Sequence, residues 1–243
     1  MKLKSFVKRF MAVMMAAVLA VSLTACGEDY PVAGEDYILA ARAAYVELDS
    51  ARVDVINDST GESEQIFIYK YDEVGLMTYS YYAVSGDTVI AQYNNGYEQY
   101  TEENGVVTYL DTGDATFTSY SKDVPYPLAD EGLIVFYKKA VNTETSYIAT
   151  NELATEVCHY YDISKLSGVE TADGMTGFKV LYYFDADGNL LFLKEVTEIT
   201  GDDGSITEYS YSIYITQQNE ITTVPNFIDI TRVQTEEEAG EEV

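Results

Sequence analysis

The feature that most constrains this chain is an alternation of apolar and more polar residues, with a period of two. The clearest run is 209–216, where Tyr209, Tyr211, Ile213 and Ile215 are the alternating large residues. Shorter alternating runs lie at 65–71, 77–81 and 89–92. Successive side chains of a strand point to opposite faces, so this period assigns one kind of side chain to each face. Such alternation is typical of an antiparallel sheet with one covered and one solvated face.

The breaks between these runs carry residues that favour tight turns. Asn94-Asn95-Gly96, Glu103-Asn104-Gly105 and Asp202-Asp203-Gly204 each end in glycine, which tolerates a positive φ. The segment 185–189 separates the apolar runs 180–184 and 190–194, so it predicts a β-hairpin. Frequent turns between short strands predict a long antiparallel meander.

Two segments have the longer period of an amphipathic helix. In 36–48 the residues Tyr37, Ala41, Ala44, Tyr45 and Leu48 fall on one helical face, without Gly or Pro. In 130–141 the shared face carries Leu133, Phe136, Tyr137, Ala140 and Val141 after an acidic start. The predicted fold class is α+β, mainly β. It is a large curved antiparallel sheet, a half-barrel, with two or three helices packed on its concave face.

Residues 1–25 have the organisation of a secretory signal peptide. Basic residues at the start precede the nearly continuous apolar run 10–23, and Leu23-Thr24-Ala25-Cys26 then matches the bacterial lipoprotein signal. In such signals cleavage occurs just before the cysteine, which is acylated and holds the protein at the membrane. The sequence therefore predicts Cys26 as the lipidated first mature residue and an extracytoplasmic location on the bacterial cell membrane. An uncleaved anchor helix and a soluble secreted product are the alternatives.

The chain divides into a signal peptide (1–25), a lipidated tether (26–35), a single domain (36–230) and an acidic tail (231–243) that we expect to be disordered. Its net charge is −27. Removing residues 1–25 leaves 10 Lys and Arg against 41 Asp and Glu, or about −31. Such a surface repels nucleic acid and anionic lipid head groups, so no nucleic-acid partner is expected, although cations or basic partners would be attracted.

Few residues offer catalytic or metal chemistry. His159 is the only histidine, and its neighbour Cys158 should point to the opposite face of a strand, so the two cannot form a thiol–imidazole pair. No Gly-x-Ser-x-Gly, phosphate-binding or dinucleotide motif is present. A calcium loop that began at Asp185 would need glycine at its sixth position and glutamate at its twelfth, where the sequence has Leu190 and Val196. We therefore predict a protein that is not an enzyme, with no catalytic residue, metal site or cofactor.

Tyrosine is the unusual component of the composition, since the chain has 23 Tyr and no Trp. Tyrosine stacks on sugars, lines apolar cavities and suits half-buried strands equally well. A glycan-binding module is therefore an open alternative.

The order of the predicted elements resembles the half-barrel carriers of lipids and lipoproteins of the LolA and LppX/LprG type. The helix 36–48 runs into the strand 50–56, and the helix 130–141 resembles the plug of that family. The hairpin 179–195, the strand 208–216 and the closing segment 221–225 resemble its C-terminal part. The resemblance implies an apolar cavity for acyl chains. Leu133, Phe136 and Tyr137 are its predicted lining.

The leading hypothesis is a non-enzymatic, membrane-anchored lipoprotein that holds a lipid or another amphiphile between curved sheet and helices. The alternative is a cell-surface interaction or structural lipoprotein with a packed core, which would bind a protein or an envelope polymer. A continuous cavity would favour the first hypothesis, and a packed sheet–helix interface would favour the second.

Overall fold

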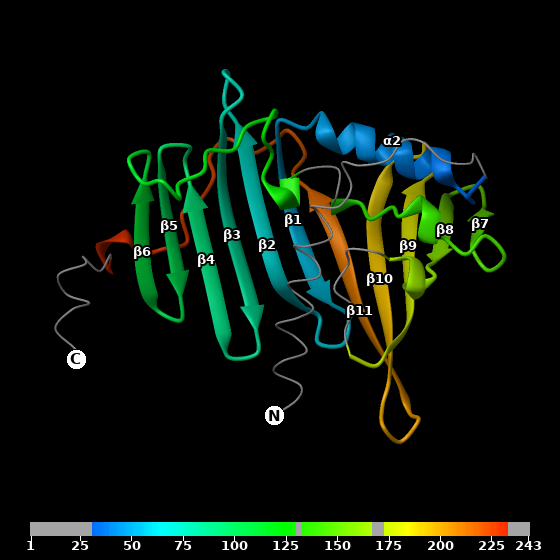
Figure 1. Cartoon of the computed structure of the whole chain (residues 1–243). Helices are drawn as coiled ribbons and strands as arrows, with labels where there is room; N and C mark the ends of the chain where they lie inside the picture. The colour runs from blue at the N-terminus through cyan, green and yellow to red at the C-terminus, as the bar shows by residue number, and fades with distance from the viewer. Residues whose placement is uncertain (1–30, 130–132, 167–172, 233–243) are drawn as a thin grey trace. The chain divides into compact units, whose positions relative to one another are not determined.

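The computed structural model describes residues 31–129, 133–166 and 173–232 (Figure 1). Its strands form an 11-stranded sheet in the order β6-β5-β4-β3-β2-β1-β11-β10-β9-β8-β7. The predicted large antiparallel sheet is confirmed by the strand pairings. The signal peptide, Cys26 and most of the acidic tail lie outside the described residues.

One α-helix occurs in the described ranges, α2 (Glu35–Val46). The strands are β1 (Ser50–Asn57), β2 (Glu62–Tyr71), β3 (Met77–Ser85), β4 (Thr88–Asn94), β5 (Glu98–Glu103), β6 (Val106–Asp111), β7 (Tyr147–Thr150), β8 (Ala154–Tyr160), β9 (Met175–Asp185), β10 (Leu190–Thr200) and β11 (Ile206–Thr216). Short 3₁₀ turns are η2 (Pro127–Ala129), η4 (Lys138–Ala140), η5 (Ile163–Lys165) and η6 (Ile230–Arg232).

The chain divides into two compact units. Unit 1 takes the described residues up to Glu47, then Val55–Ser63 and Pro127–Ile215, so it holds α2 and β7 to β10 with nearly all of β11. Unit 2 takes Leu48–Asp54, Glu64–Tyr126 and the described residues from Thr216 onward, which include most of β2 and all of β3 to β6.

The hairpin predicted around 185–189 is confirmed in unit 1. The Asp185 carboxylate accepts the backbone N–H of Asp187 at 2.9 Å and of Asn189 at 2.8 Å. Gly188 has a φ of +85°, which glycine adopts without steric cost. Side-chain acceptors and a left-handed glycine therefore close the turn, as the residue types predict.

The helix predicted over 36–48 is also confirmed, although its buried face differs in part from the predicted one. Ile38, Ala41, Arg42 and Tyr45 are buried, whereas Ala44 is exposed. Ile38 was not among the predicted face residues, because the alanines of this helix allow more than one choice of apolar stripe.

The helix predicted over 130–141 is wrong across its described part, 133–141. Residues 134–137 are not helical. The short 3₁₀ turn η4 follows them at Lys138–Ala140. Val141 instead forms a bridge with Tyr161, and the Val135 carbonyl oxygen accepts a hydrogen bond from a tyrosine hydroxyl of β9. Bonds to the sheet replace an internal helical ladder, so the predicted second and third helices are not confirmed.

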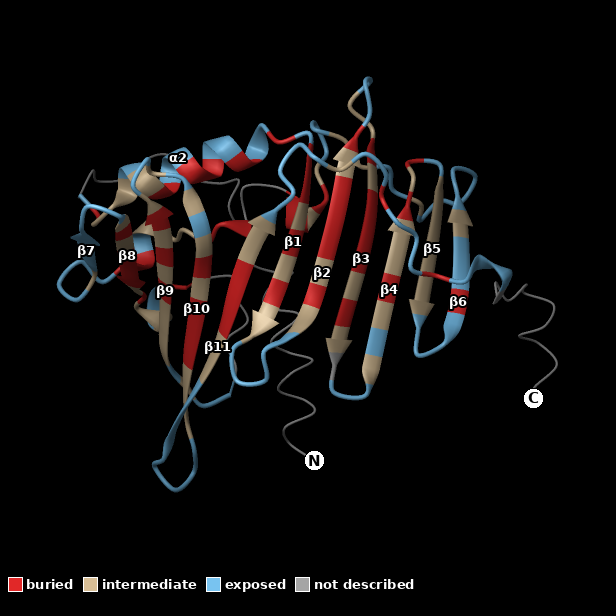
Figure 2. Cartoon of the chain, turned by 180° about the vertical axis from the view of Figure 1, so that it is seen from behind, coloured by how far each residue is buried: buried red, intermediate tan, exposed pale blue. Residues whose placement is uncertain are grey.

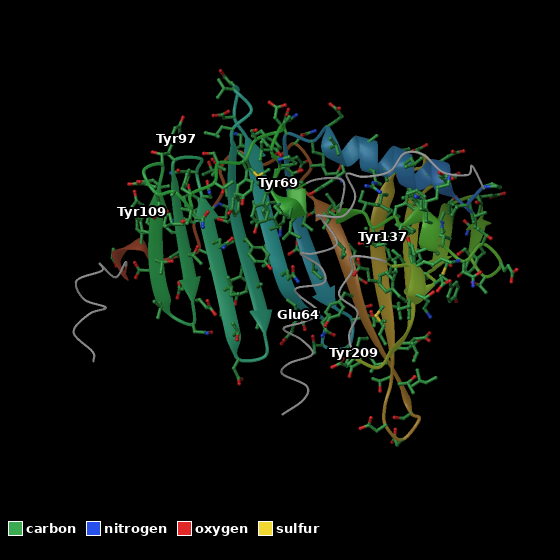
Figure 3. All side chains as sticks on the ribbon, viewed as in Figure 1. Glu64, Tyr69, Tyr97, Tyr109, Tyr137 and Tyr209 are labelled. Carbon is green, nitrogen blue, oxygen red and sulfur yellow. The ribbon has the colours of Figure 1, made fainter. Side chains whose placement is uncertain are left out.

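Both faces of the sheet in unit 2 are covered by its own chain. On one face Tyr126 packs on Phe67 at 5.0 Å and on Tyr79 at 4.4 Å between ring centroids. On the other face Ile228 joins a buried apolar cluster with Ala91 and Val107. Much of the chain's tyrosine therefore serves packing, and Figure 3 shows Tyr69 on this part of the sheet.

Candidate ligand-binding site

The candidate site lies on one face of the sheet in unit 1, which we call the covered face. Pairing aligns His159 of β8 with Val180 of β9, Val180 with Glu195 of β10, and Glu195 with Tyr211 of β11. Side chains at paired positions share a face, so these four form one row across the strands. Figure 2 shows buried and partly buried residues alternating along these strands.

The rows on either side of this central row complete the covered face. The row toward the 185–189 hairpin holds Val157, Tyr182, Leu193 and Ile213. The row on the other side holds Tyr161, Phe178, Thr197 and Tyr209. All but Phe178 and Tyr209 are buried. The face is therefore an apolar and tyrosine-rich surface with a few polar groups set into it.

Two elements cover this face. Tyr37 of α2 packs on Phe184 at 5.1 Å, and the Tyr45 hydroxyl donates to the Leu128 carbonyl oxygen at 3.0 Å. The second element is the segment 133–141, which we call the strap. An ion pair of 2.8 Å between Lys138 and Glu35 links the strap to α2.

Glu195 occupies the centre of the covered face and is only 4% exposed. Burial raises the pKa of its carboxyl to about 7, because removal from water disfavours the charged form. Burial is the main cause that raises the pKa values of Tyr137 and Tyr182; the Glu195 charge adds to this effect, and Arg42 opposes it. Near neutral pH, Glu195 therefore changes easily between the neutral and the charged form.

His159 is fully buried and uses only one of its two ring nitrogens. Nε2 lies 2.6 Å from the Ala33 carbonyl oxygen. A carbonyl only accepts, so Nε2 carries the proton and Nδ1 presents a lone pair. Nδ1 is buried without a partner among the described residues. Burial lowers the pKa of His159, which keeps the ring neutral.

Thr197 is the third polar group of the covered face, two residues after Glu195 on β10. Its hydroxyl is buried and has no hydrogen-bond partner within the described part of the chain. Buried polar groups of native proteins are nearly always paired, and an unpaired one costs roughly 1–3 kcal/mol. Together the three groups offer an acceptor at His159, a hydroxyl at Thr197 and a carboxyl at Glu195.

The three residues predicted to line a cavity all lie on the strap or at its start. Leu133 is buried, whereas Phe136 and Tyr137 are partly exposed. The Phe136 ring lies 5.7 Å from the His159 ring, and the Tyr137 ring lies 6.0 Å from that of Tyr161. Figure 3 labels Tyr137 over β9 and β10. Their role in binding stays a prediction.

Sequence reasoning did not find Glu195, Thr197 or Arg42, and it gave His159 no functional role. The sequence feature that could have indicated the site was Glu195, a glutamate at a position of the strand that faces the interior. The run 190–200 hides this signal, because apolar residues occur on both of its faces.

Cys158 and His159 do lie on opposite faces. The Cys158 thiol is buried, and burial raises its pKa. A protonated thiol is a poor nucleophile. Within the described ranges, no three His, Cys, Asp or Glu residues are grouped so that they could hold a metal ion.

Comparisons with known proteins add a distant likeness in fold. No family model and no curated protein matches this chain. Among solved structures, LprF from Mycobacterium bovis shares 15% identity over 79% of this chain and 95% of that chain, with a TM-score of 0.42. A likeness at this level assigns no ligand or activity.

Proposed function

We propose that this chain is a non-enzymatic lipoprotein of the bacterial cell envelope that binds a lipid or another amphiphile on the covered face of unit 1. Acylated Cys26 would tether it to the extracytoplasmic side of the membrane. The sequence motif at 23–26 supports the anchor. Over the described ranges, no helix has the length and apolar character needed to cross a bilayer.

One observation carries the binding proposal. Two buried polar atoms, His159 Nδ1 and Thr197 Oγ1, lie on one apolar face without hydrogen-bond partners among the described residues, and the buried carboxyl of Glu195, with its raised pKa, lies on the same face. The free energy they cost is recovered when a ligand supplies the missing hydrogen bonds. An amphiphile fits this surface because it brings a polar head and an apolar tail together.

The chemistry of the face narrows the head group. His159 Nδ1 can only accept a hydrogen bond, and both Thr197 and Glu195 can accept one. A head group with hydroxyl or amine donors would therefore satisfy all three. Apolar neighbours such as Leu193 and Ile213 would contact the tail, at about 25 cal/mol per Å² of apolar surface removed from water.

The strap offers a route of entry. Residues 134–137 lack a helical hydrogen-bond ladder, so displacing them breaks fewer backbone bonds than displacing a helix. Its contacts include the ion pair of Lys138 with Glu35 and the bond from Tyr182 to the Val135 carbonyl oxygen. We propose that the strap moves to admit the ligand and then covers it.

Native mass spectrometry followed by lipid extraction tests this function. The sample is the chain from residue 26 onward with Cys26→Ser, purified from bacteria. We expect a stoichiometric co-purified amphiphile and a several-fold lower occupancy in Thr197→Val. Thr155→Val is the matched control, since Thr155 is buried on the same face but bonded to Thr150 at 3.2 Å. A protein that is empty and takes up no added amphiphile would exclude the proposal.

The alternative function, a surface interaction lipoprotein, has its own observation. On the opposite face of unit 1, Phe192 stacks on Tyr183 at 4.4 Å and on Tyr214 at 5.1 Å. These rings are partly exposed and form a continuous stack across three strands. An empty protein whose binding to cell-wall material is lost in Phe192→Ala would favour this alternative.

A further inference from the structure

A pocket of about 220 Å³ lies in unit 2, between strands β2 to β4 and the C-terminal segment. Its walls include Lys70, Tyr71 and Asp72 at the end of β2, Thr78 and Tyr93, and the segment 222–224. Drug-sized ligands occupy pockets of roughly 300 Å³ or more. The volume therefore suits a smaller molecule, of the size of one sugar unit.

The segment 222–224, which forms one wall of the pocket, is held in place by hydrogen bonds on either side of it in the sequence. Before it, the Asn219 backbone N–H donates to the Ser50 carbonyl oxygen at 2.8 Å, and the Asn219 side chain accepts the Asp49 backbone N–H at 2.7 Å. After it, the Ser80 hydroxyl donates to the Pro225 carbonyl oxygen. The pocket is thus a built feature of unit 2.

Lys70 gives the pocket a positive charge. Its ammonium donates to the Thr222 carbonyl oxygen at 3.0 Å, which leaves two N–H donors. Other lysines, such as Lys122 and Lys194, pair with carboxylates at 2.8 and 2.7 Å. No described carboxylate lies within 4.0 Å of the Lys70 ammonium. The pocket lining holds one cationic group, Lys70, and one acidic group, Asp72, so Lys70 is the group there that can pair with an anion.

The remaining polar groups of the pocket favour hydroxyl-rich ligands. Thr78, Thr222 and Thr223 carry hydroxyl groups, which both donate and accept hydrogen bonds. Burial raises the pKa of Tyr93, so its hydroxyl stays neutral. The Asp72 Oδ1 atom accepts hydrogen bonds from the backbone N–H groups of Val74 and Leu76, and it thereby stabilises the turn 72–76.

We propose that this pocket binds a small hydroxylated carboxylate, of the class of a single uronic acid unit. The ligand carboxylate would pair with Lys70, and its ring hydroxyls would bond to the threonines and Tyr93. The acidic surface repels an extended polyanion, so an isolated acidic sugar or one at the end of a chain fits better than an acidic polymer. This site is independent of the proposed amphiphile site in unit 1.

Ligand-observed NMR titration tests this site on the chain from residue 26 onward with Cys26→Ser. The probes are glucuronate, glucose and acetate. We expect saturable binding of glucuronate, with at least tenfold weaker binding of glucose and of acetate. Lys70→Met should weaken glucuronate binding at least tenfold, and Lys70→Arg should retain part of it. Lys165→Met is the control, since Lys165 pairs with Asp162 in unit 1 at 3.2 Å and should leave binding unchanged.

Three results would each overturn this site: no saturable glucuronate binding, equal binding by Lys70→Met and the parent, or acetate binding as tightly as glucuronate. Urea unfolding midpoints of all variants establish that the folds are equivalent. Failure here leaves the amphiphile proposal intact, because mass spectrometry tests that proposal on other residues.

Discussion

Replacing Glu195 with glutamine should change how the stability of the protein depends on pH. The carboxyl has a pKa of about 7 in the folded protein against an ordinary value of 4.5. The pKa is raised because burial disfavours the charged carboxyl in the folded protein. Ionisation of Glu195 therefore lowers the free energy of unfolding as pH rises from 4.5 through 7. The shift corresponds to about 3 kcal/mol, at roughly 1.4 kcal/mol per pKa unit. Glutamine keeps the shape and removes the titration.

Urea unfolding followed by tyrosine fluorescence at pH 5, 6, 7 and 8 measures this effect. We expect Glu195→Gln to gain about 2.5 kcal/mol on the parent between pH 5 and pH 8, because part of the shift is already expressed at pH 5. Other carboxyls, such as those of Asp58 and Asp185, have lowered pKa values, so their protonation lowers the free energy of unfolding as pH falls. This effect is the same in the parent and in Glu195→Gln. The difference between their curves of unfolding free energy against pH therefore reports Glu195 alone.

Glu62→Gln is the matched control, since Glu62 is exposed on β2. Its curve should run parallel to that of the parent. Parallel curves for Glu195→Gln as well would refute the reasoning, because they would mean that the carboxyl is solvated or paired. The candidate site would then lose its central polar group.

Three further predictions follow from the anchor, the core and the start of α2. Cys26→Ser should move the protein from the detergent phase to the aqueous phase in detergent partitioning, and unchanged partitioning would contradict lipidation. Tyr126→Ala should lower the free energy of unfolding by about 3–5 kcal/mol, whereas Tyr97→Ala, at a 63% exposed side chain, should change it little. Gly34→Ala should lower the melting temperature, because φ is +65° and a Cβ would lie 2.4 Å from Val157 Cγ2; an unchanged melting temperature would contradict the close packing.

Local chemistry determined the elements that the sequence predicted. The β9–β10 hairpin depends on the acceptors of Asp185 and the positive φ of Gly188, and both act within a few residues. The strand 209–216 follows from its own alternation, and α2 from a run without breakers. The turn at Asn104-Gly105, with φ values of 51° and 89°, belongs to the same class.

The tertiary structure decided what depends on distant partners. The strap has a helical pattern, yet Val141 pairs with Tyr161 and the Val135 carbonyl accepts from Tyr182, so sheet contacts replace helical ones. Glu195 is one of 41 acidic residues in the sequence, and its inward position is hidden because apolar residues occur on both faces of its strand. Its character comes from the strands beside it and from the elements that cover it. Periodicity and turn chemistry act over a few residues and can be read in order, whereas burial and polar pairing are set by segments far apart in the chain.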